Sequence, residues 1–188
     1  MAMLLGGFGC SQATMTNPKR SATEQLLLST AADRAIKKIP FSDFENKRVF
    51  VDGTYFDGYD SKYVLGTIRE AVSRAGGLLQ SDIGKSEVVI EARSRAHSID
   101  SASSLLGIPE LGVPAPFAGA LHTPELALYK SSRQDAFAEF AILAYETGSR
   151  DYLTSTTSNV GKAYNHYYKI LWVISWTRTD LPEKHKKK

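Results

Sequence analysis

Cysteine is nearly absent from this sequence, and Cys10 is the only one among 188 residues. Because a lone thiol has no partner within its own chain, an internal disulfide is excluded. The sequence also lacks any apolar run of about 18 residues, which excludes a typical transmembrane helix. It has no internal repeat of about 20 to 50 residues, so solenoid and propeller architectures are excluded too.

A strong excess of one charge is missing as well. The 23 basic and 20 acidic residues leave a net charge of +3, and three of the basic residues are the terminal lysines 186–188. Without them the balance is close to neutral, which argues against a nucleic-acid-binding protein. With 43% apolar and 23% charged residues, the chain has the composition of an ordinary globular protein that can bury a core.

Clustered metal ligands are the third absence. The histidines His97, His122, His166 and His185 have no second histidine three or four residues away and no cysteine beside them. Zinc sites in proteins are built from ligands at such spacings, so we expect neither a metal nor another cofactor. No nucleophile can be matched with a base from the sequence, and we therefore assign no catalytic residue.

Cys10 follows a short, apolar, glycine-rich run over residues 4–9. Small residues around a cysteine, with apolar residues upstream, are typical of the end of a signal peptide in a bacterial lipoprotein, where the thiol is acylated with palmitate or a similar chain. Only nine residues precede Cys10 and none is charged, whereas signal peptides normally begin with basic residues. The hypothesis we favour is a lipid anchor, and the alternative is an unmodified cysteine in a cytosolic protein.

The chain divides into three parts. Residues 1–20 are expected to be a signal remnant or lipid anchor followed by a flexible tether, because residues 11–20 are small and polar and contain a proline. Residues 21–183 are expected to form a single domain. Residues 184–188 are expected to be a basic, disordered tail.

Two helices are predicted in the first half of the domain. Ser21 and Glu24 have the spacing of a capping box, and apolar residues at helical spacing follow over 22–38. A second helix is expected to be capped by Asp60 or by the serine after it. It should end at the glycine pair that starts at Gly76, since glycine accepts the left-handed conformation found after helix ends.

Short apolar runs predict strands, and most of these runs lie in the second half of the chain. Helices early and strands late predict an α+β fold. We expect two helices packed on a mixed, mostly antiparallel sheet of about five to six strands, in a sandwich-like arrangement. Gly148 is expected to supply the positive φ of a hairpin turn. The predicted strands cover residues 48–52, 78–79, 87–96, 126–130, 137–146, 151–158 and 169–179.

A long irregular segment is expected over about 99–124, where four prolines interrupt apolar residues. Exposed apolar side chains lower solubility unless they pack against something. We therefore choose Leu106, Ile108, Val113 and Phe117 as candidate partner-binding residues. They pack on the domain's own sheet, on another subunit or on a membrane, and the sequence leaves these three alternatives open.

The loop Gly53–Asp60 is aromatic and acidic. Tyr55 and Tyr59 are further partner-binding candidates, because their rings could stack on a ligand or on a neighbouring subunit. The alternative is that they cover an edge between a helix and the sheet. Arg93 and Arg95 alternate along a predicted strand, where they either bind an anionic polymer or are ordinary solvated charges.

Several segments are similar to those of known envelope proteins. The strand at 48–52, the helix ending at 73–77, the strand at 87–92 and the strand with a Thr-Gly turn at 141–148 resemble the curli-secretion-channel type of domain. Penicillin-binding-protein activator lipoproteins and the N-terminal domain of the Tol-Pal translocation protein are relatives in that superfamily. This resemblance implies an α+β domain in the bacterial envelope, and we expect it to be lipid-anchored on the periplasmic face of the outer membrane.

A second resemblance is to an uncharacterised family of bacterial lipoproteins that has no assigned activity. It rests on residues 22–29, 105–109 and 123–130. Together, the two resemblances cover about residues 21–183.

Three functional hypotheses follow. The first is a non-enzymatic, lipid-anchored envelope protein that binds a protein partner or assembles with its own copies. The second is an enzyme or small-ligand-binding protein that uses the Gly53–Asp60 loop. The third is a soluble cytosolic adaptor without an anchor.

Overall fold

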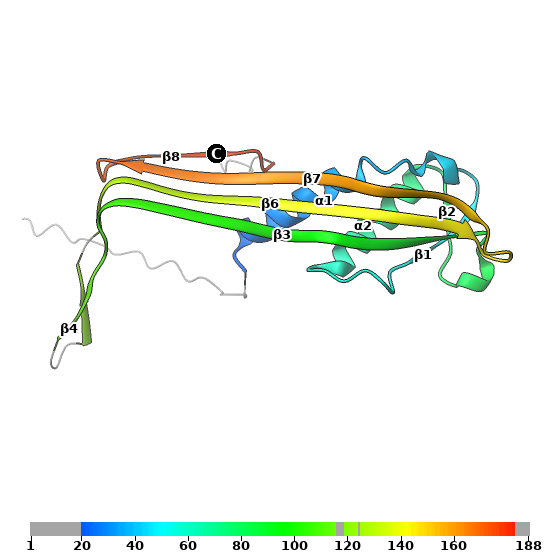
Figure 1. Ribbon diagram of the computed structural model, residues 1–188, viewed down its shortest axis with the longest axis horizontal. Helices are drawn as coiled ribbons and strands as arrows, with labels where there is room; N and C mark the ends of the chain where they lie inside the picture. Colours follow the sequence, from blue (N-terminus) through cyan, green and yellow to red (C-terminus); the bar gives the residue numbers. More distant parts are fainter. Residues whose placement is uncertain (1–19, 116–118, 124, 183–188) are drawn as a thin grey trace, which may run out of the picture.

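The computed structural model describes residues 20–115, 119–123 and 125–182 (Figure 1). This part of the chain holds two α-helices and a six-stranded mixed sheet, which confirms the predicted α+β class. Cys10 and Phe117 lie outside the described residues, as does the predicted basic tail. The helices are α1 (Ala22–Ile36) and α2 (Ser61–Arg74), with 3₁₀ turns η1 (Phe41–Phe44) and η2 (Ile83–Lys85); the strands are β1 (Arg48–Asp52), β2 (Leu78–Leu79), β3 (Val88–Ile108), β4 (Gly112–Ala115), β5 (Gly119–His122), β6 (Leu126–Glu146), β7 (Tyr152–Ile170) and β8 (Ile174–Thr179).

The sheet is long and narrow, with the strand order β2-β1-β3-β6-β7-β8. Strand β1 is parallel to both of its neighbours, and β3, β6, β7 and β8 form antiparallel pairs. Strands β3 and β6 have 21 residues each, so they extend for about 70 Å at a rise of about 3.3 Å per residue. Strands β4 and β5 form a separate hairpin between β3 and β6.

The prediction of an irregular segment over 99–124 is wrong for its first third, which is strand, and for the part that forms the β4–β5 hairpin. Strand β3 continues to Ile108, and β4 and β5 are paired with each other. The predicted strands at 126–130 and 137–146 are one strand, β6. The residues between them are polar, and so is β3 opposite them, as in the pair Ser103↔Ser132. Their strand conformation comes from cross-strand hydrogen bonds, which leave no apolar pattern in the sequence.

Two predicted turns also differ. Gly148 does not have a positive φ; Arg150, two residues later, has φ +67°. The amide of Arg150 donates to the carbonyl of Glu146 at 3.0 Å, so the left-handed residue comes at the end of the turn. The predicted strand at 169–179 is interrupted by a turn at residues 171–173, and only Ile174–Thr179 returns as β8.

The predicted helix boundaries agree closely with the structure. The amide of Glu24 donates to Ser21 Oγ at 3.2 Å, and the amide of Ser21 donates to Glu24 Oε2 at 2.8 Å, so the capping box is present. Gly76 has φ +89° and follows α2, as a left-handed helix end requires. No helix in the described residues is long and apolar enough to cross a membrane.

The helices cover only one half of the sheet, as Figure 1 shows. Helix α1 packs on β6 and β7, and α2 packs beside α1 and β1. The core lies between these helices and the near half of the sheet, while the far half of β3, β6 and β7 extends beyond them. The largest fully buried side chains are those of Leu27, Ile36, Phe44, Val49, Val64, Ile68, Val72, Val89, Ile90 and Phe140.

Helix α1 lies directly against β7 at Gly161. A Cβ atom on Gly161 would lie 1.9 Å from the carbonyl oxygen of Ala31 and 2.5 Å from the amide nitrogen of Ala35. Both alanines are fully buried, as is Ala138 on the neighbouring strand. Small residues on both surfaces therefore let the helix backbone lie directly on the sheet.

This contact predicts a large effect of one methyl group. We expect Gly161→Ala to lower the free energy of unfolding by about 3 kcal/mol, because backbone atoms of α1 cannot move aside cheaply. Chemical denaturation measures the change. The matched control is Gly148→Ala, where a Cβ meets no atom within 4 Å; it should change stability by no more than about 0.5 kcal/mol. Equal stability of the two variants would contradict this account of the packing.

Candidate functional site

The predicted partner-binding residues lie in two separate places. Leu106 and Ile108 lie at the C-terminal end of β3, with 64% and 55% of their surface exposed. Val113 is in β4, but its side chain lies outside what the structure describes. Tyr55 and Tyr59 are exposed in the loop between β1 and α2. The structure does not bring the tyrosines together with the other candidates.

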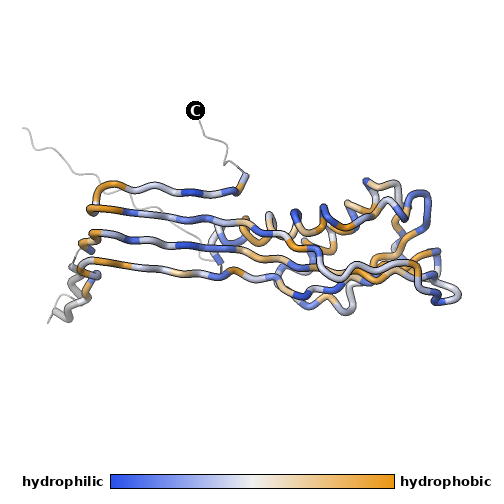
Figure 2. Tube along the Cα trace, turned by 45° about the horizontal axis from the view of Figure 1, so that its top comes forward, coloured by the Kyte–Doolittle hydropathy of each residue, from blue (hydrophilic) through white to orange (hydrophobic). Residues whose placement is uncertain are grey.

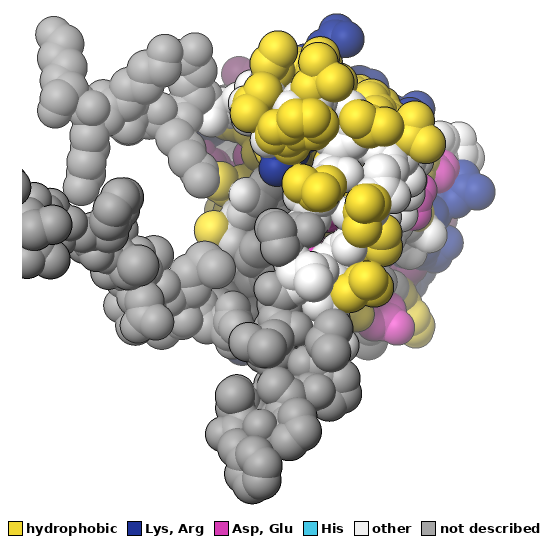
Figure 3. Space-filling view, turned by 90° about the vertical axis from the view of Figure 1, so that its left-hand side faces the viewer, with side chains coloured by type: hydrophobic (Ala, Val, Ile, Leu, Met, Phe, Trp, Pro, Cys, Tyr) yellow, Lys and Arg dark blue, Asp and Glu magenta, His cyan; other side chains and the backbone are white. Residues whose placement is uncertain are grey.

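Leu106 and Ile108 belong to a larger exposed apolar surface at the far end of the sheet. Figure 3 views this end and shows hydrophobic side chains gathered across it, and Figure 2 shows the strand ends as the most hydrophobic part of the far half. We name this surface the apolar tip. It consists of Leu105, Leu106, Ile108, Leu111, Leu126, Leu128, Tyr129, Leu171, Trp172, Val173, Ile174 and Trp176, all of them exposed.

Strand register aligns the apolar tip across the sheet. Leu106 pairs with Tyr129, and Tyr129 pairs with Ile170. One residue further inward, Leu105 pairs with Lys130 and Lys130 pairs with Lys169. Since β6 and β7 change from apolar to basic at the same level, the tip has a sharp boundary.

The β7–β8 turn contributes the most exposed part of the tip. Leu171 and Trp172 have φ values of +46° and +48°, a region that large side chains rarely adopt. The amides of Leu171 and Trp172 donate to the carbonyls of Leu128 and Ala127 at 3.0 and 2.9 Å, which holds the turn against β6. Glycine or asparagine would suit this backbone better, so the sequence keeps large apolar side chains here at a cost in stability.

A bulge shapes the β3 side of the tip. Gly107 has φ +148°, and the register of β3 on β6 shifts between Leu106 and Gly107. A Cβ on Gly107 would lie 2.2 Å from the carbonyl oxygen of Leu126. Glycine is therefore required for the two strand ends to approach each other.

The Gly53–Asp60 loop is explained by local structure. Asp52 Oδ1 accepts from the amide and the hydroxyl of Thr54 at 2.9 and 2.6 Å, which is ordinary turn chemistry. Asp60, one of the two residues predicted as the cap of α2, is its N-cap residue, but its side chain makes no capping hydrogen bond. Its carboxylate instead pairs with Arg20 at 2.9 Å, and the Arg20 guanidinium lies 4.7 Å from the centre of the Tyr59 ring.

Arg93 and Arg95 are paired within the domain. Arg93 Nε donates to the largely buried carboxylate of Glu91 at 2.6 Å. Arg95 lies 3.0 Å from the carboxylate of Glu139 and donates to the carbonyl of Thr157 at 2.8 Å. Both guanidinium groups thus have protein partners, which weakens the alternative of a binding site for an anionic polymer.

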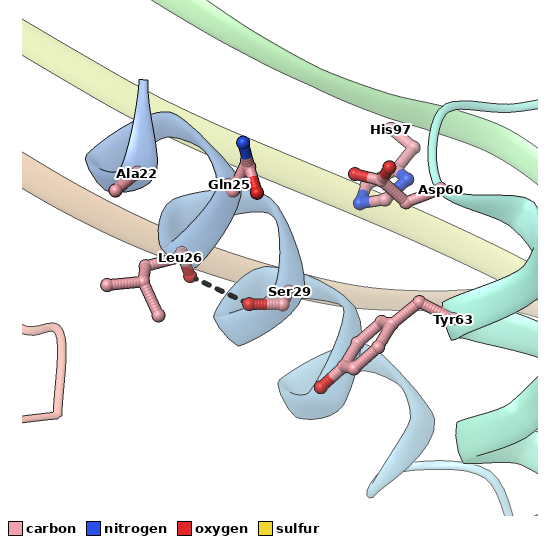
Figure 4. Close-up of a pocket in the computed structure, with 7 residues that line it drawn as sticks. All are labelled: Ala22, Gln25, Leu26, Ser29, Asp60, Tyr63 and His97. Atoms are coloured by element: carbon pink, nitrogen blue, oxygen red, sulfur yellow. Dashed lines mark hydrogen bonds between the residues drawn. The ribbon is translucent and has the colours of Figure 1, made fainter. Parts of the chain in front are cut away.

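A cavity of about 540 Å³ lies between the start of α1, the start of α2 and β3 (Figure 4). Its lining includes Asp60, whose carboxylate is paired with Arg20. His97, also in the lining, is buried and places Nδ1 2.9 Å from the carbonyl of Tyr59 and Nε2 3.2 Å from that of Leu28.

The other polar groups of the cavity are also engaged. The hydroxyl of Ser29 donates to the carbonyl of Leu26, as the dashed line in Figure 4 marks. Gln25 donates to the carbonyl of Arg20 at 3.2 Å. Burial and a hydrogen bond to Asp33 raise the pKa of Tyr63 above its ordinary value, so its hydroxyl stays a neutral donor. Because each polar lining side chain has a protein partner, this cavity offers little polar chemistry to a substrate.

No group of three or more possible metal ligands lies together in the described residues. His166 Nε2 is 2.9 Å from Asp135 Oδ1 in the far half of the sheet, and its ring lies beside that of Tyr164. The exposed end of the sheet, and not a cleft, is the most distinctive surface of the described chain.

Sequence reasoning missed the contribution of the β7–β8 turn to the tip. Residues 170–174 form a run of five large apolar residues after a polar stretch, and we interpreted them as part of the single strand predicted over 169–179. Both tryptophans of the chain, Trp172 and Trp176, lie in or beside this turn. The run was a usable signal, but only the register shows that it lies beside Tyr129 and Leu106.

Fold and surface together define a class: an elongated α+β protein with helices over one half of its sheet and an apolar end on the other. The chain matches the model of a family of unknown function (DUF6655) over residues 4–175. Since this match covers most of the chain, the protein belongs to that family. No curated protein matches the sequence.

The strained turn gives a stability prediction. We expect Leu171→Asn to raise the free energy of unfolding by about 0.5 to 1 kcal/mol, since asparagine tolerates a positive φ better than leucine. The unfolding midpoint in denaturant measures this. Val173→Asn is the control: Val173 is 72% exposed and has no positive φ, so its replacement should change little. A loss of stability in Leu171→Asn would show that the side chain stabilises the turn.

Proposed function

We propose that this protein is a non-enzymatic component of the bacterial cell envelope, anchored by an acylated Cys10, that assembles with its own copies through the edges of its sheet. The observation that carries the proposal is the exposed outer edge of β3. Strand β1 pairs with β3 only from Val88 to Glu91. In the described structure, no strand pairs with the rest of this edge, which leads to Leu106 and Ile108.

The opposite side of the sheet has a second exposed edge. Strand β8 is exposed along its whole length and pairs only with β7 among the described strands. Edge strands present unpaired N–H and C=O groups and readily pair with another chain. Proteins that stay monomeric usually protect such edges, for example with prolines or covering loops. In this chain, the stretch of β3 from Ser98 to Ile108 contains one charged residue and no proline.

The directions of the strands make the two edges complementary. Strands β3, β6, β7 and β8 alternate in direction through three antiparallel pairs. Strand β8 therefore runs opposite to β3, and β8 of one copy can pair with β3 of the next in the same antiparallel geometry. Such a head-to-tail contact repeats into a ring or a filament.

The proposal also bears on the sandwich-like packing of helices on the sheet that we expect from the sequence. Helices α1 and α2 form a second layer over the near half of the sheet. In this proposal the sandwich-like arrangement is limited to that half, and the far half is stabilised by neighbouring copies. Added strands would stabilise this exposed half of the sheet, because no helix packs on it.

The location rests on the sequence around Cys10 and on the resemblance to envelope lipoproteins. The non-enzymatic role is supported by the paired polar groups of the cavity at His97 and Asp60. A protein partner other than a second copy would use the same β3 edge by strand addition.

Proline substitution tests the edge pairing. Consecutive N–H groups of a strand point to opposite edges, so of Ser101→Pro and Ala102→Pro one removes an outward donor and the other a donor to β6. The outward variant should keep the wild-type unfolding midpoint and shift the protein toward the monomer in light scattering. The inward variant should lose about 3 kcal/mol of stability and serves as the internal control. An unchanged assembly in the stably folded variant, or a wild-type protein that is monomeric at every concentration, would refute the proposal.

Metabolic labelling tests the anchor. The wild-type protein should incorporate labelled palmitate and fractionate with membranes, and its processing should be sensitive to globomycin. Cys10→Ser should lose the label, because no other cysteine is available for acylation. Full-length, unlabelled wild-type protein in the cytosol would contradict the anchor and favour the adaptor hypothesis.

A further inference from the structure

The apolar tip is apolar on both faces of the sheet. Leu105 and Leu106 are consecutive residues of β3, so their side chains point to opposite faces, and both are exposed. Leu128 and Tyr129 form a second consecutive exposed pair on β6. A protein partner docks on one face or pairs with one edge, whereas a lipid environment surrounds the end of a sheet on all sides.

The composition of the tip is graded along the strands. The strand ends at 104–109, 126–129 and 170–174 contain no charged residue. Next inward come the lysines Lys130 and Lys169, which are cross-strand neighbours. Lys130 reaches back to Glu125, the residue before Leu126 at the outer end of β6, and balances its charge in an ion pair of 2.7 Å.

Aromatic rings lie at the same boundary. Tyr168 stacks on Trp176 with a centroid distance of 5.4 Å and an interplanar angle of 18°. Tryptophan and tyrosine favour the interface between hydrocarbon and water, and lysine side chains extend from it toward water. From the apolar end inward, the register gives apolar residues, then the Lys130–Lys169 pair and, one residue further, the Tyr168–Trp176 pair. The lysines and the aromatic rings thus form one narrow band next to the apolar end, as expected at a membrane surface.

The depth of the tip fits one leaflet. Four residues separate Leu126 from Lys130, which at about 3.3 Å per residue is about 13 Å. Half of the hydrocarbon core of a bilayer is about 15 Å thick. The tip is therefore long enough to enter one leaflet.

The proposed anchor can reach the same membrane; this one argument rests on the proposed acylation of Cys10. Helix α1 starts at the level of Gln134, since Gln134 Nε2 donates to Glu24 Oε1 at 3.4 Å. Eight residues of β6, about 26 Å, separate Gln134 from Leu126. Ten residues from Cys10 to Arg20 can span up to about 35 Å, so the anchor and the tip can meet one surface.

We infer that the apolar tip inserts into one leaflet of a lipid bilayer, with the Tyr168–Trp176 pair at the interface and the helical half of the domain held away from the membrane. The partner is thus a lipid surface. Insertion supplies the apolar surroundings that the tip lacks in water, and it adds a second membrane contact to that of the anchor.

Tryptophan fluorescence tests the inference directly, because the only two tryptophans lie in the tip. The full chain with Cys10→Ser is used, so that acylation plays no part. On addition of phosphatidylcholine vesicles, emission should shift to shorter wavelength, and lipids brominated on their acyl chains should quench it. Trp172, studied in Trp176→Phe, should be quenched more strongly than Trp176, studied in Trp172→Phe, because it lies nearer the end of the sheet.

Charged substitutions locate the insertion. Val173→Asp and Leu106→Asp, on two different strand ends, should each weaken vesicle binding by about tenfold or more, since a carboxylate in hydrocarbon costs more than the 1.4 kcal/mol of a tenfold change. The matched control is Leu78→Asp, an exposed leucine of β2 at the far side of the helical half. It should bind vesicles as the parent protein does.

Three results would overturn the inference. The first is no spectral shift and no flotation of the folded protein with vesicles. The second is an equal loss of binding in Leu78→Asp. The third is a shift of Trp172 emission, studied in Trp176→Phe, that follows protein concentration without lipid; Trp172 lies in the β7–β8 turn and not on the β8 edge, so this result would assign the tip itself to contacts between copies. A protein that stays monomeric but inserts would refute the assembly proposal alone, so the two failures are distinguishable.

Discussion

The contact of α1 with β7 at Gly161 determines the shape of the whole molecule. The helix backbone can lie on the sheet there because the facing residues, Ala31, Ala35 and Ala138, are all small and buried. Toward the far end, β7 carries tyrosines and His166 in place of glycine and alanine, so a helix cannot approach as closely. The cover is thus limited to one half of the sheet, and the other half extends alone.

The far half depends on hydrogen bonds between strands and not on a core. Its middle section is polar on both strands of the central pair, and its end is apolar on both faces. Elements with few buried apolar contacts open most easily, so this half is the part that gains most from a neighbour. The two proposals supply two such neighbours: other copies along the edges, and lipid at the tip.

In the helical half, the polar side chains around the α1–α2 cavity and on β3 have partners within the protein. The cavity between α1, α2 and β3 has its polar side chains bound to protein groups, and the arginines on β3 are paired with glutamates. The aromatic loop that suggested a ligand site uses Asp52 for a turn and Asp60 for an ion pair. Function in this protein is therefore best sought at the exposed end and edges of the sheet.

The local features were predictable because they depend on neighbouring residues. The capping box of Ser21 and Glu24, the left-handed glycine at Gly76 and the buried start of β3 all follow from short patterns. Leu106 and Ile108 were found the same way, as apolar residues in a segment with no evident core. Asp60 was placed correctly at the start of α2, but its carboxylate binds Arg20, a distant residue whose position only the fold decides.

By itself, the sequence determined the fold class, the start of each helix and the apolar character of the β3 end. Tertiary structure decided that the polar stretches around residue 100 in β3 and residue 133 in β6 pair as strands. Their strand conformation comes from cross-strand hydrogen bonds, which leave no alternation of apolar residues in either sequence. Tertiary structure also decided that Trp172 lies near Leu106, more than sixty residues earlier in the chain. The register of three long strands, β3, β6 and β7, places these residues at the same end of the sheet. Register depends on how the strands pair, and the sequence of one strand does not determine it.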